Sequence, residues 1–150
     1  MKKYLLLFGF FVMLKFSDAQ TLDPHLWKDR VILLFTASRQ DAFYQKQTHI
    51  LTEKTEEVTE RALKIYTILP GGGTRPGGGG LSAGPARHLY STYGVTPGKG
   101  FTFVLIGKDG TEKLRKEEPV TARELFALID SMPMRRAEMR RKRGGGSKKN

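Results

Sequence analysis

The chain has 150 residues, a formal net charge of +11 and no cysteine. This length fits a single domain, and glycine together with a basic C-terminus dilutes the apolar fraction to 39%. Because the sequence lacks cysteine, disulfide bonds and thiol-based catalysis by this chain are both excluded.

The positive charge is concentrated at the C-terminus. Residues 135–150 carry eight basic residues and one acidic residue, whereas residues 20–134 have a net charge of only +2. The alkaline character therefore belongs to this tail and not to the domain before it. We expect the tail to be largely disordered, although its first part can extend the preceding helix.

The N-terminus is typical of a secretory signal peptide. Two lysines precede an apolar run, Leu5–Leu14, and small residues follow at Ser17 and Ala19, where a signal peptidase would inspect them. The run is about half of the roughly 20 residues that a transmembrane helix needs. We therefore predict a signal peptide over residues 1–19 and a mature chain that is periplasmic or secreted.

The mature chain begins with a short lead-in that contains Trp27, which we expect to cover one end of the sheet. Five consecutive apolar residues, Val31–Phe35, then predict a strand that is buried on both faces. A polar turn leads from this strand to a helix expected over residues 42–59, with Ser38 or Asp41 as its N-cap.

Residues 62–69 predict a second strand, which makes a parallel βαβ unit with the first strand and the helix between them. Residues 70–80 follow with seven glycines and two prolines. We expect this segment to be a flexible loop. A short helix is then expected up to Tyr93, with Gly94 as its stop signal.

The C-terminal part of the domain predicts a hairpin and a final helix. Phe101–Ile106 and Thr111–Arg115 are expected to pair as antiparallel strands, because an Asp-Gly turn signal lies between them. A capping box at Thr121–Glu124 begins a helix whose apolar residues repeat at helical spacing, and Pro133 is expected to end it.

The predicted order of elements is therefore β-α-β-α-β-β-α. It combines a parallel pair and an antiparallel hairpin in a central mixed sheet with helices on both faces. This α/β arrangement is that of the thioredoxin-like fold, expected here over residues 20–134. Such a fold keeps its chemistry at the turn after the first strand, which is Thr36–Asp41 in this chain.

Four segments carry a resemblance to a known family: residues 27–35, 93–95, 101–110 and 118–136. They resemble a thioredoxin-like domain of unknown function that occurs in short secreted bacterial proteins and as a module of vertebrate extracellular proteins of the sushi-repeat-containing and coiled-coil-domain types. The resemblance covers about residues 27–139. It implies a thioredoxin-like fold, some kinship to peroxiredoxins, secretion and no established activity.

The resemblance also shows what the turn lacks. The two redox cysteines of thioredoxin would fall near and just after Gln40, and its cis-proline just before the strand at Phe101, but this chain has neither there. A serine needs a paired base to replace a thiolate, so we interpret Ser38 as a turn or cap residue. The helix N-terminus could still bind an anion through Ser38, Arg39, Gln40 and Asp41, although the charge of Asp41 opposes this.

Other catalytic and metal-binding patterns are weak. Residues 71–80 lack the Lys-Ser or Lys-Thr pair that a phosphate loop needs after its last glycine. His25, His49 and His88 are scattered, and we expect no carboxylate beside them at ligand spacing. No metal site and no cofactor are therefore predicted.

The basic tail favours binding to anionic polymers or lipid head groups by release of counterions. The cations expected to make this contact are Arg135, Arg136, Arg140, Arg141, Lys142, Arg143, Lys148 and Lys149. No aromatic residue follows Arg135, so base stacking is not indicated and nucleic acid is not expected as a partner. The alternative role of the tail is to keep the domain soluble.

Two functional hypotheses follow. The first is a redox-inactive, non-catalytic module that acts by contact with an unidentified protein partner outside the cytoplasm, with its tail on an anionic surface. The second is an enzyme or small-anion binder that uses the polar residues of the turn. We favour the first, because the fold signature is intact while the redox residues are missing.

Overall fold

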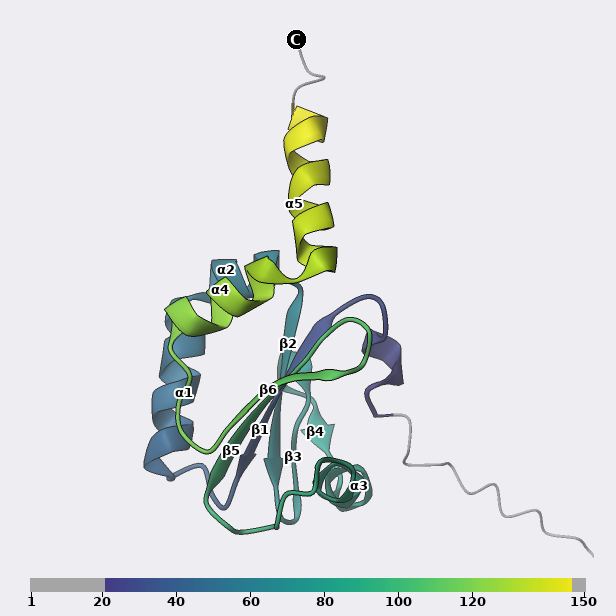
Figure 1. The fold of residues 1–150 in the computed structure, drawn as a ribbon. Coiled ribbons are helices and arrows are strands. Elements are labelled where there is room, and N and C mark those ends of the chain that lie inside the picture. The colour runs from purple at the N-terminus through teal and green to yellow at the C-terminus, as the bar shows by residue number, and fades with distance from the viewer. Residues whose placement is uncertain (1–20, 147–150) are drawn as a thin grey trace, which may run out of the picture.

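The structure is a computed structural model that describes residues 21–146. A six-stranded mixed sheet with strand order β4-β3-β2-β1-β5-β6 forms its centre (Figure 1). The strands are Arg30–Thr36 (β1), Leu63–Leu69 (β2), Gly72–Thr74 (β3), Gly80–Leu81 (β4), Phe101–Ile106 (β5) and Glu112–Lys116 (β6). The predicted signal peptide lies outside the described residues, as do Lys148 and Lys149.

Helices cover both faces of the sheet, with α1, α2 and α4 on one face and α3 on the other (Figure 1). The helices are Ala42–Glu53 (α1), Thr55–Glu60 (α2), Ala83–Tyr93 (α3), Ala122–Ser131 (α4) and Pro133–Gly146 (α5), with 3-10 turns at Asp23–His25 (η2) and Pro76–Gly78 (η3). Within residues 21–146, no helix combines the length and the apolar character that crossing a bilayer requires. The predicted α/β thioredoxin-like architecture is confirmed.

β1 is the central strand, and all seven of its residues are buried. It pairs in parallel with β2 and antiparallel with β5. Because side chains alternate along a strand, Ile32 and Leu34 pack with α1 and α4, whereas Val31, Leu33 and Phe35 pack with α3. The unbroken apolar run in the sequence thus serves two cores, one on each face of the sheet.

The glycine-rich segment, residues 70–80, which the sequence predicts as a flexible loop, contains β3 and the first residue of β4. β3 pairs antiparallel with β2, and β4 pairs antiparallel with β3. Glycine permits this close approach, because a Cβ atom at Gly73 would clash with the carbonyl oxygen of Thr67. The composition that suggests mobility is here a condition for tight strand pairing.

Helix boundaries also differ from the sequence prediction. The single helix expected over residues 42–59 is divided at Lys54 into α1 and α2. Pro133 was predicted to end the last helix, but it is the first residue of α5. Proline is tolerated there because the N–H group it lacks would have no partner within the first turn of a helix. α5 continues to Gly146, so the prediction of a largely disordered tail is wrong for residues 135–146.

The lead-in segment before β1 differs from the prediction at Trp27. Trp27 was expected to cover one end of the sheet, but it is 63% exposed. Its backbone is held instead, because its N–H group donates a hydrogen bond of 2.6 Å to the carbonyl oxygen of Lys108 in the β5–β6 turn.

Candidate functional site

The polar side chains of the turn between β1 and α1 form hydrogen bonds that stabilise the turn. The carboxylate of Asp41 accepts a hydrogen bond of 2.9 Å from the N–H group of Tyr44, so Asp41 is the N-cap of α1. The hydroxyl of Ser38 accepts a hydrogen bond of 3.2 Å from the N–H group of Gln40. Asp41 and Ser38 therefore act as a cap and a turn residue.

Arg39 connects this turn to the edge of the sheet. Its Nη2 donates to Thr74 Oγ1 in β3 at 2.6 Å, and its Nη1 donates to the hydroxyl of Tyr44 at 3.4 Å. That hydroxyl lies 3.0 Å from Thr67 Oγ1 in β2. The turn does bring the four predicted residues together, but three of them are engaged in holding the turn, and Gln40 is exposed.

A cavity of about 470 Å³ opens beside the turn. Asp41 and Phe43 line one part of it, and the loop before β5 lines another together with Arg115 and Glu117. Arg115 already binds the carboxylate of Glu112 through two hydrogen bonds of 3.0 and 2.7 Å. The mixed charges of this lining do not single out an anion, so the cavity gives the second hypothesis no specific support.

The prediction that the histidines have no carboxylate neighbour is wrong. His25 Nδ1 lies 2.8 Å from Asp29 Oδ2, and its Nε2 lies 2.8 Å from the hydroxyl of Tyr66. The i, i+4 spacing that brings Asp29 to His25 recurs at His49, whose Nδ1 lies 3.5 Å from a glutamate carboxylate. A cavity of about 370 Å³ borders His25, but both ring nitrogens already have partners. No group of three or more potential metal ligands is present among residues 21–146.

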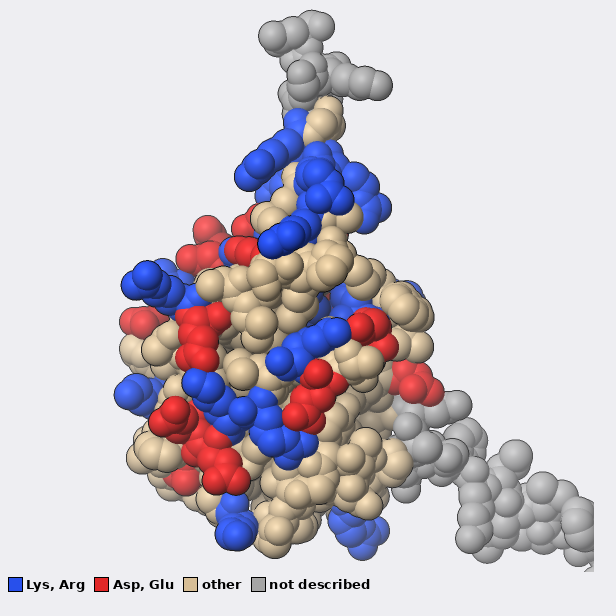
Figure 2. Space-filling view, in the orientation of Figure 1, with Lys and Arg blue, Asp and Glu red and all other residues tan. Residues whose placement is uncertain are grey.

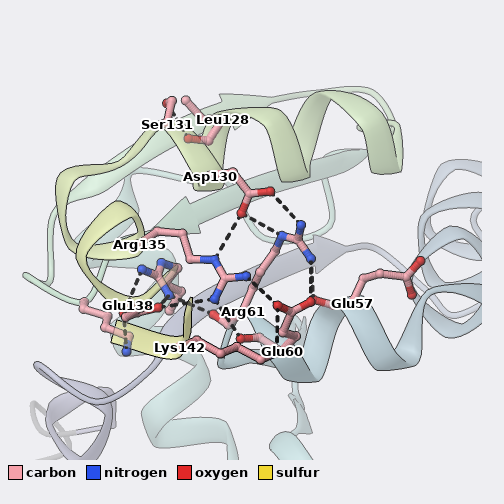
Figure 3. Close-up of polar contacts among 11 residues, drawn as sticks. Glu57, Glu60, Arg61, Leu128, Asp130, Ser131, Arg135, Glu138 and Lys142 are labelled. Atoms are coloured by element: carbon pink, nitrogen blue, oxygen red, sulfur yellow. Dashed lines mark hydrogen bonds and ion pairs between the residues drawn. The ribbon is translucent and has the colours of Figure 1, made fainter. Parts of the chain in front are cut away.

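A charged cluster lies where α5 leaves the domain (Figure 3). Arg135, in the first turn of α5, is only 5% exposed. Its Nε donates to Asp130 at 3.1 Å, and its Nη2 donates to Glu60 Oε1 at 3.1 Å. Arg61 binds the same Asp130 through hydrogen bonds of 3.1 and 2.6 Å. These contacts join the ends of α2 and α4 to the start of α5.

A second buried arginine completes the cluster. Arg30, the first residue of β1, is 1% exposed and donates to both carboxylate oxygens of Glu138 at 3.3 and 3.2 Å. Lys108 pairs with the same Glu138 at 2.8 Å. We call this set of residues the anchor cluster: Arg30, Glu60, Arg61, Lys108, Asp130, Arg135 and Glu138. In the described part of the chain, no buried side-chain nitrogen or oxygen lacks a hydrogen-bond partner.

The anchor cluster lowers the pKa of its three carboxyl groups. Hydrogen bonds from Arg135 and then from Lys142 lower the pKa of Glu60. Burial alone would raise the pKa of Asp130 and of Glu138, but hydrogen bonds and charges from their arginine and lysine partners outweigh burial. All three groups are therefore held in the ionised form that binds α5 to the domain.

The buried position of Arg135 corrects its predicted role as a surface contact. Five other cations of the tail are exposed: Arg136, Arg140, Arg141, Lys142 and Arg143. Arg136, Arg140 and Arg143 recur at i, i+4 and i+7 and so share one face of α5, while Arg141 and Lys142 lie on other sides. In Figure 2 Lys and Arg cover much of this projecting helix, whereas acidic and basic residues alternate on the domain below it.

A family model described as a domain of unknown function (DUF4174) matches residues 21–138. The chain belongs to this family. The match ends at Glu138, so it includes every residue of the anchor cluster and stops before Arg140. The family match therefore includes the residues that hold α5 on the domain, whereas most of the exposed cations of α5 lie beyond the end of the match.

Curated proteins that are similar to this DUF4174 chain include the sushi repeat-containing protein SRPX2 of Rattus norvegicus and of Mus musculus. Each is 29% identical over 132 residues, which is 84% of this chain but 28% and 27% of those proteins. The SRPX2 of Homo sapiens is 28% identical over 133 residues. The chain therefore spans little more than a quarter of the length of these relatives.

Among solved structures, the reduced 2-Cys peroxiredoxin of Plasmodium vivax is similar, with a TM-score of 0.56 and 16% sequence identity. The similarity covers 79% of this chain and 84% of the peroxiredoxin chain. At this identity it shows the thioredoxin-like fold alone.

Proposed function

We propose that this chain is a redox-inactive, non-catalytic thioredoxin-like module that acts by contact with a protein partner outside the cytoplasm and attaches to anionic polymers through α5. The observation that carries the attachment is the anchor cluster, which fastens the base of α5 while five cations beyond it stay exposed. The export of the chain rests on the signal-peptide pattern of residues 1–19.

Anchoring favours binding in two ways. When the exposed cations bind a polyanion, they displace its condensed counterions into solution. This release is the main source of affinity in such contacts. A disordered tail would lose conformational entropy on binding, whereas a helix that is already formed and held at its base loses less.

The distribution of charge around α5 favours a linear polyanion over a flat membrane. Arg136, Arg140 and Arg143 occupy one face, and Arg141 and Lys142 point to other sides, so a flexible polymer can contact more of them than a plane can. A helix that inserts at a membrane interface has a continuous apolar face opposite its charged face. The apolar residues of α5 do not form such a face.

The turn between β1 and α1 supports the non-catalytic part of the proposal. The sequence has no thiol, and Ser38 and Asp41 serve as hydrogen-bond acceptors within the turn. No base contacts the Ser38 hydroxyl within this turn to activate it as a nucleophile, and the Asp41 carboxylate is engaged as the N-cap of α1.

The test compares two variants with the same change in net charge. In residues 20–150, Arg136, Arg140 and Arg143 are changed together to Gln, and affinity for sodium polyphosphate is measured at several salt concentrations. We expect the slope of log affinity against log salt concentration to fall by about 2. An equal loss of affinity and of salt slope in a control variant with three other exposed cations changed to Gln would contradict attachment through α5.

The control changes three exposed cations of the domain, Lys46, Arg87 and Lys99, together to Gln. It should keep most of the affinity and most of the salt slope, because these cations are spread over α1, α3 and the loop before β5. A separate assay of insulin disulfide reduction by residues 20–150 should show no rate above background, and reduction above background would contradict redox inactivity.

A further inference from the structure

Exposed apolar side chains lie in the two segments that the anchor cluster joins, the lead-in before β1 and the first turn of α5. The large apolar side chains that are exposed among residues 21–146 are Leu26, Trp27, Phe43 and Met134. The backbone N–H group of Trp27 donates to the carbonyl oxygen of Lys108, and Lys108 Nζ lies 2.8 Å from Glu138 Oε1 of α5. Met134 lies one helical turn before Glu138 and so on the same side of α5. Leu26 and Trp27, just before β1, and Met134, in the first turn of α5, are therefore each connected to the anchor cluster, whereas Phe43 lies in α1, after the other end of β1.

The backbone at Trp27 is strained. Its φ angle is 64°, a left-handed conformation that costs a bulky residue about 1–3 kcal/mol and persists only where the surroundings impose it. The bond to Lys108 imposes it from one side, and the N–H groups of Lys28 and Asp29 both donate to the carbonyl oxygen of His25 at 2.9 Å on the other. The fold thus holds an indole outward in a costly conformation that its own core does not use.

We propose that Trp27 is a stacking platform for a sugar ring, and that the exposed cations of α5 bind acidic groups of the same ligand, which is therefore an acidic polysaccharide. This inference rests on the proposed attachment through α5 and names its ligand class. The face of an indole packs against the C–H face of a pyranose ring, while sulfate or carboxylate groups on that ring pair with arginine and lysine. Lys28, exposed and next to Trp27, supplies the nearest cation in the sequence.

Other ligand classes match only part of this surface. Inorganic polyphosphate offers charge without a ring, and a neutral glycan offers a ring without charge. A protein partner in a stable complex buries about 800 Å² on each side, for which the three exposed apolar side chains here are few. Single-stranded nucleic acid is bound by several aromatic side chains on which successive bases stack, whereas Trp27 is the one aromatic residue among the three exposed apolar side chains.

Trp27 is the sole tryptophan of the chain, so tryptophan fluorescence reports directly on its indole. Residues 20–150 are mixed with a heparin octasaccharide or with sodium polyphosphate, and quenching of tryptophan fluorescence by acrylamide is measured. We expect heparin to reduce the quenching constant at least twofold, because a stacked ring shields the indole. Polyphosphate should bind without changing it.

Substitutions then separate stacking from charge. By calorimetry, Trp27→Ala should weaken heparin binding about fivefold to tenfold and leave polyphosphate binding unchanged. Trp27→Phe, which keeps an aromatic face, should restore most of the heparin affinity. Phe43→Ala, which removes the exposed aromatic residue at the other end of β1, should change neither.

Three results would overturn the inference. If Trp27→Ala weakens neither ligand while the α5 arginine variant weakens both, attachment through α5 stands and stacking fails. If single-stranded DNA or anionic vesicles protect Trp27 and heparin does not, the ligand belongs to another class. If the wild-type chain binds neither heparin nor polyphosphate, the proposed attachment fails together with this inference.

Discussion

Arg135 shows at the scale of one residue how a charge run can hide a structural contact. The other five cations between positions 136 and 143 are exposed, whereas Arg135 itself is buried between Asp130 and Glu60. Removing one partner of a buried ion pair leaves the other charges uncompensated, which is costly when they cannot be hydrated. Asp130 and Glu60 remain partly exposed, so water relieves part of this cost.

We predict that Arg135→Ala lowers the free energy of unfolding by about 1–3 kcal/mol. The matched control is Arg136→Ala, which removes the same side chain one position later from an exposed site and should change stability by less than about 0.5 kcal/mol. Urea unfolding followed by circular dichroism measures both. Equal effects of the two substitutions would show that Arg135 does not anchor α5.

Local interactions of single residues were predictable from the sequence, and long-range ones were not. The cap at Asp41 and the capping box at Thr121 involve residues three positions apart, so the sequence carries the whole signal. The pair of Arg30 and Glu138 joins residues 108 positions apart, and no local pattern indicates such a partner. A basic residue at the edge of an apolar strand simply marks where the strand begins.

At the scale of secondary structure, the docking of α5 depends on ionised carboxylates. The pKa values of Glu60, Asp130 and Glu138 are lower in the folded chain than the ordinary values near 4. Such groups contribute stability that is complete above their unfolded pKa and is lost as pH falls through the folded pKa. We therefore predict that stability is level near neutral pH and declines from about pH 5 downward.

Urea unfolding at a series of pH values measures this decline, and Asp130→Asn is the informative variant. It removes one titrating group while keeping a side chain of the same shape, so it should be less stable than the wild type at pH 7 and lose less stability on acidification. A variant whose stability falls as steeply as that of the wild type would exclude Asp130 as a contributor.

Glycine composition illustrates why element boundaries were harder to predict than the fold. The apolar strands β1 and β5 and the amphipathic helix α4 follow from periodicity, and together they fix the thioredoxin-like core. Residues 70–80 have almost no side chains to pack, so their composition is the same for a mobile loop and for tightly paired edge strands. Only the approach of Thr67 to Gly73, which is a tertiary contact, distinguishes the two.

At the scale of the whole molecule, buried contacts between α5 and the domain extend past residue 134, where the sequence predicts the domain to end, as far as Glu138. Arg135 and Glu138 belong to the anchor cluster, and the family match also ends at Glu138. The cations that lie beyond this point have few contacts with the domain, of which the pair between Lys142 and Glu60 at 3.4 Å is an exposed example. Stability and attachment should therefore reside in adjoining parts of the same helix.

Two truncations test this division. We predict that residues 20–139 unfold at nearly the same temperature as residues 20–150 but bind polyphosphate and heparin far more weakly. Residues 20–134 lose Glu138, which leaves Arg30 buried without its carboxylate, and the melting temperature should fall by about 4–8 °C for each kcal/mol lost. If the shorter chain is as stable as the longer one, α5 is an appendage; if residues 20–139 bind as well as the full chain, the cations beyond Met139 are not the attachment site.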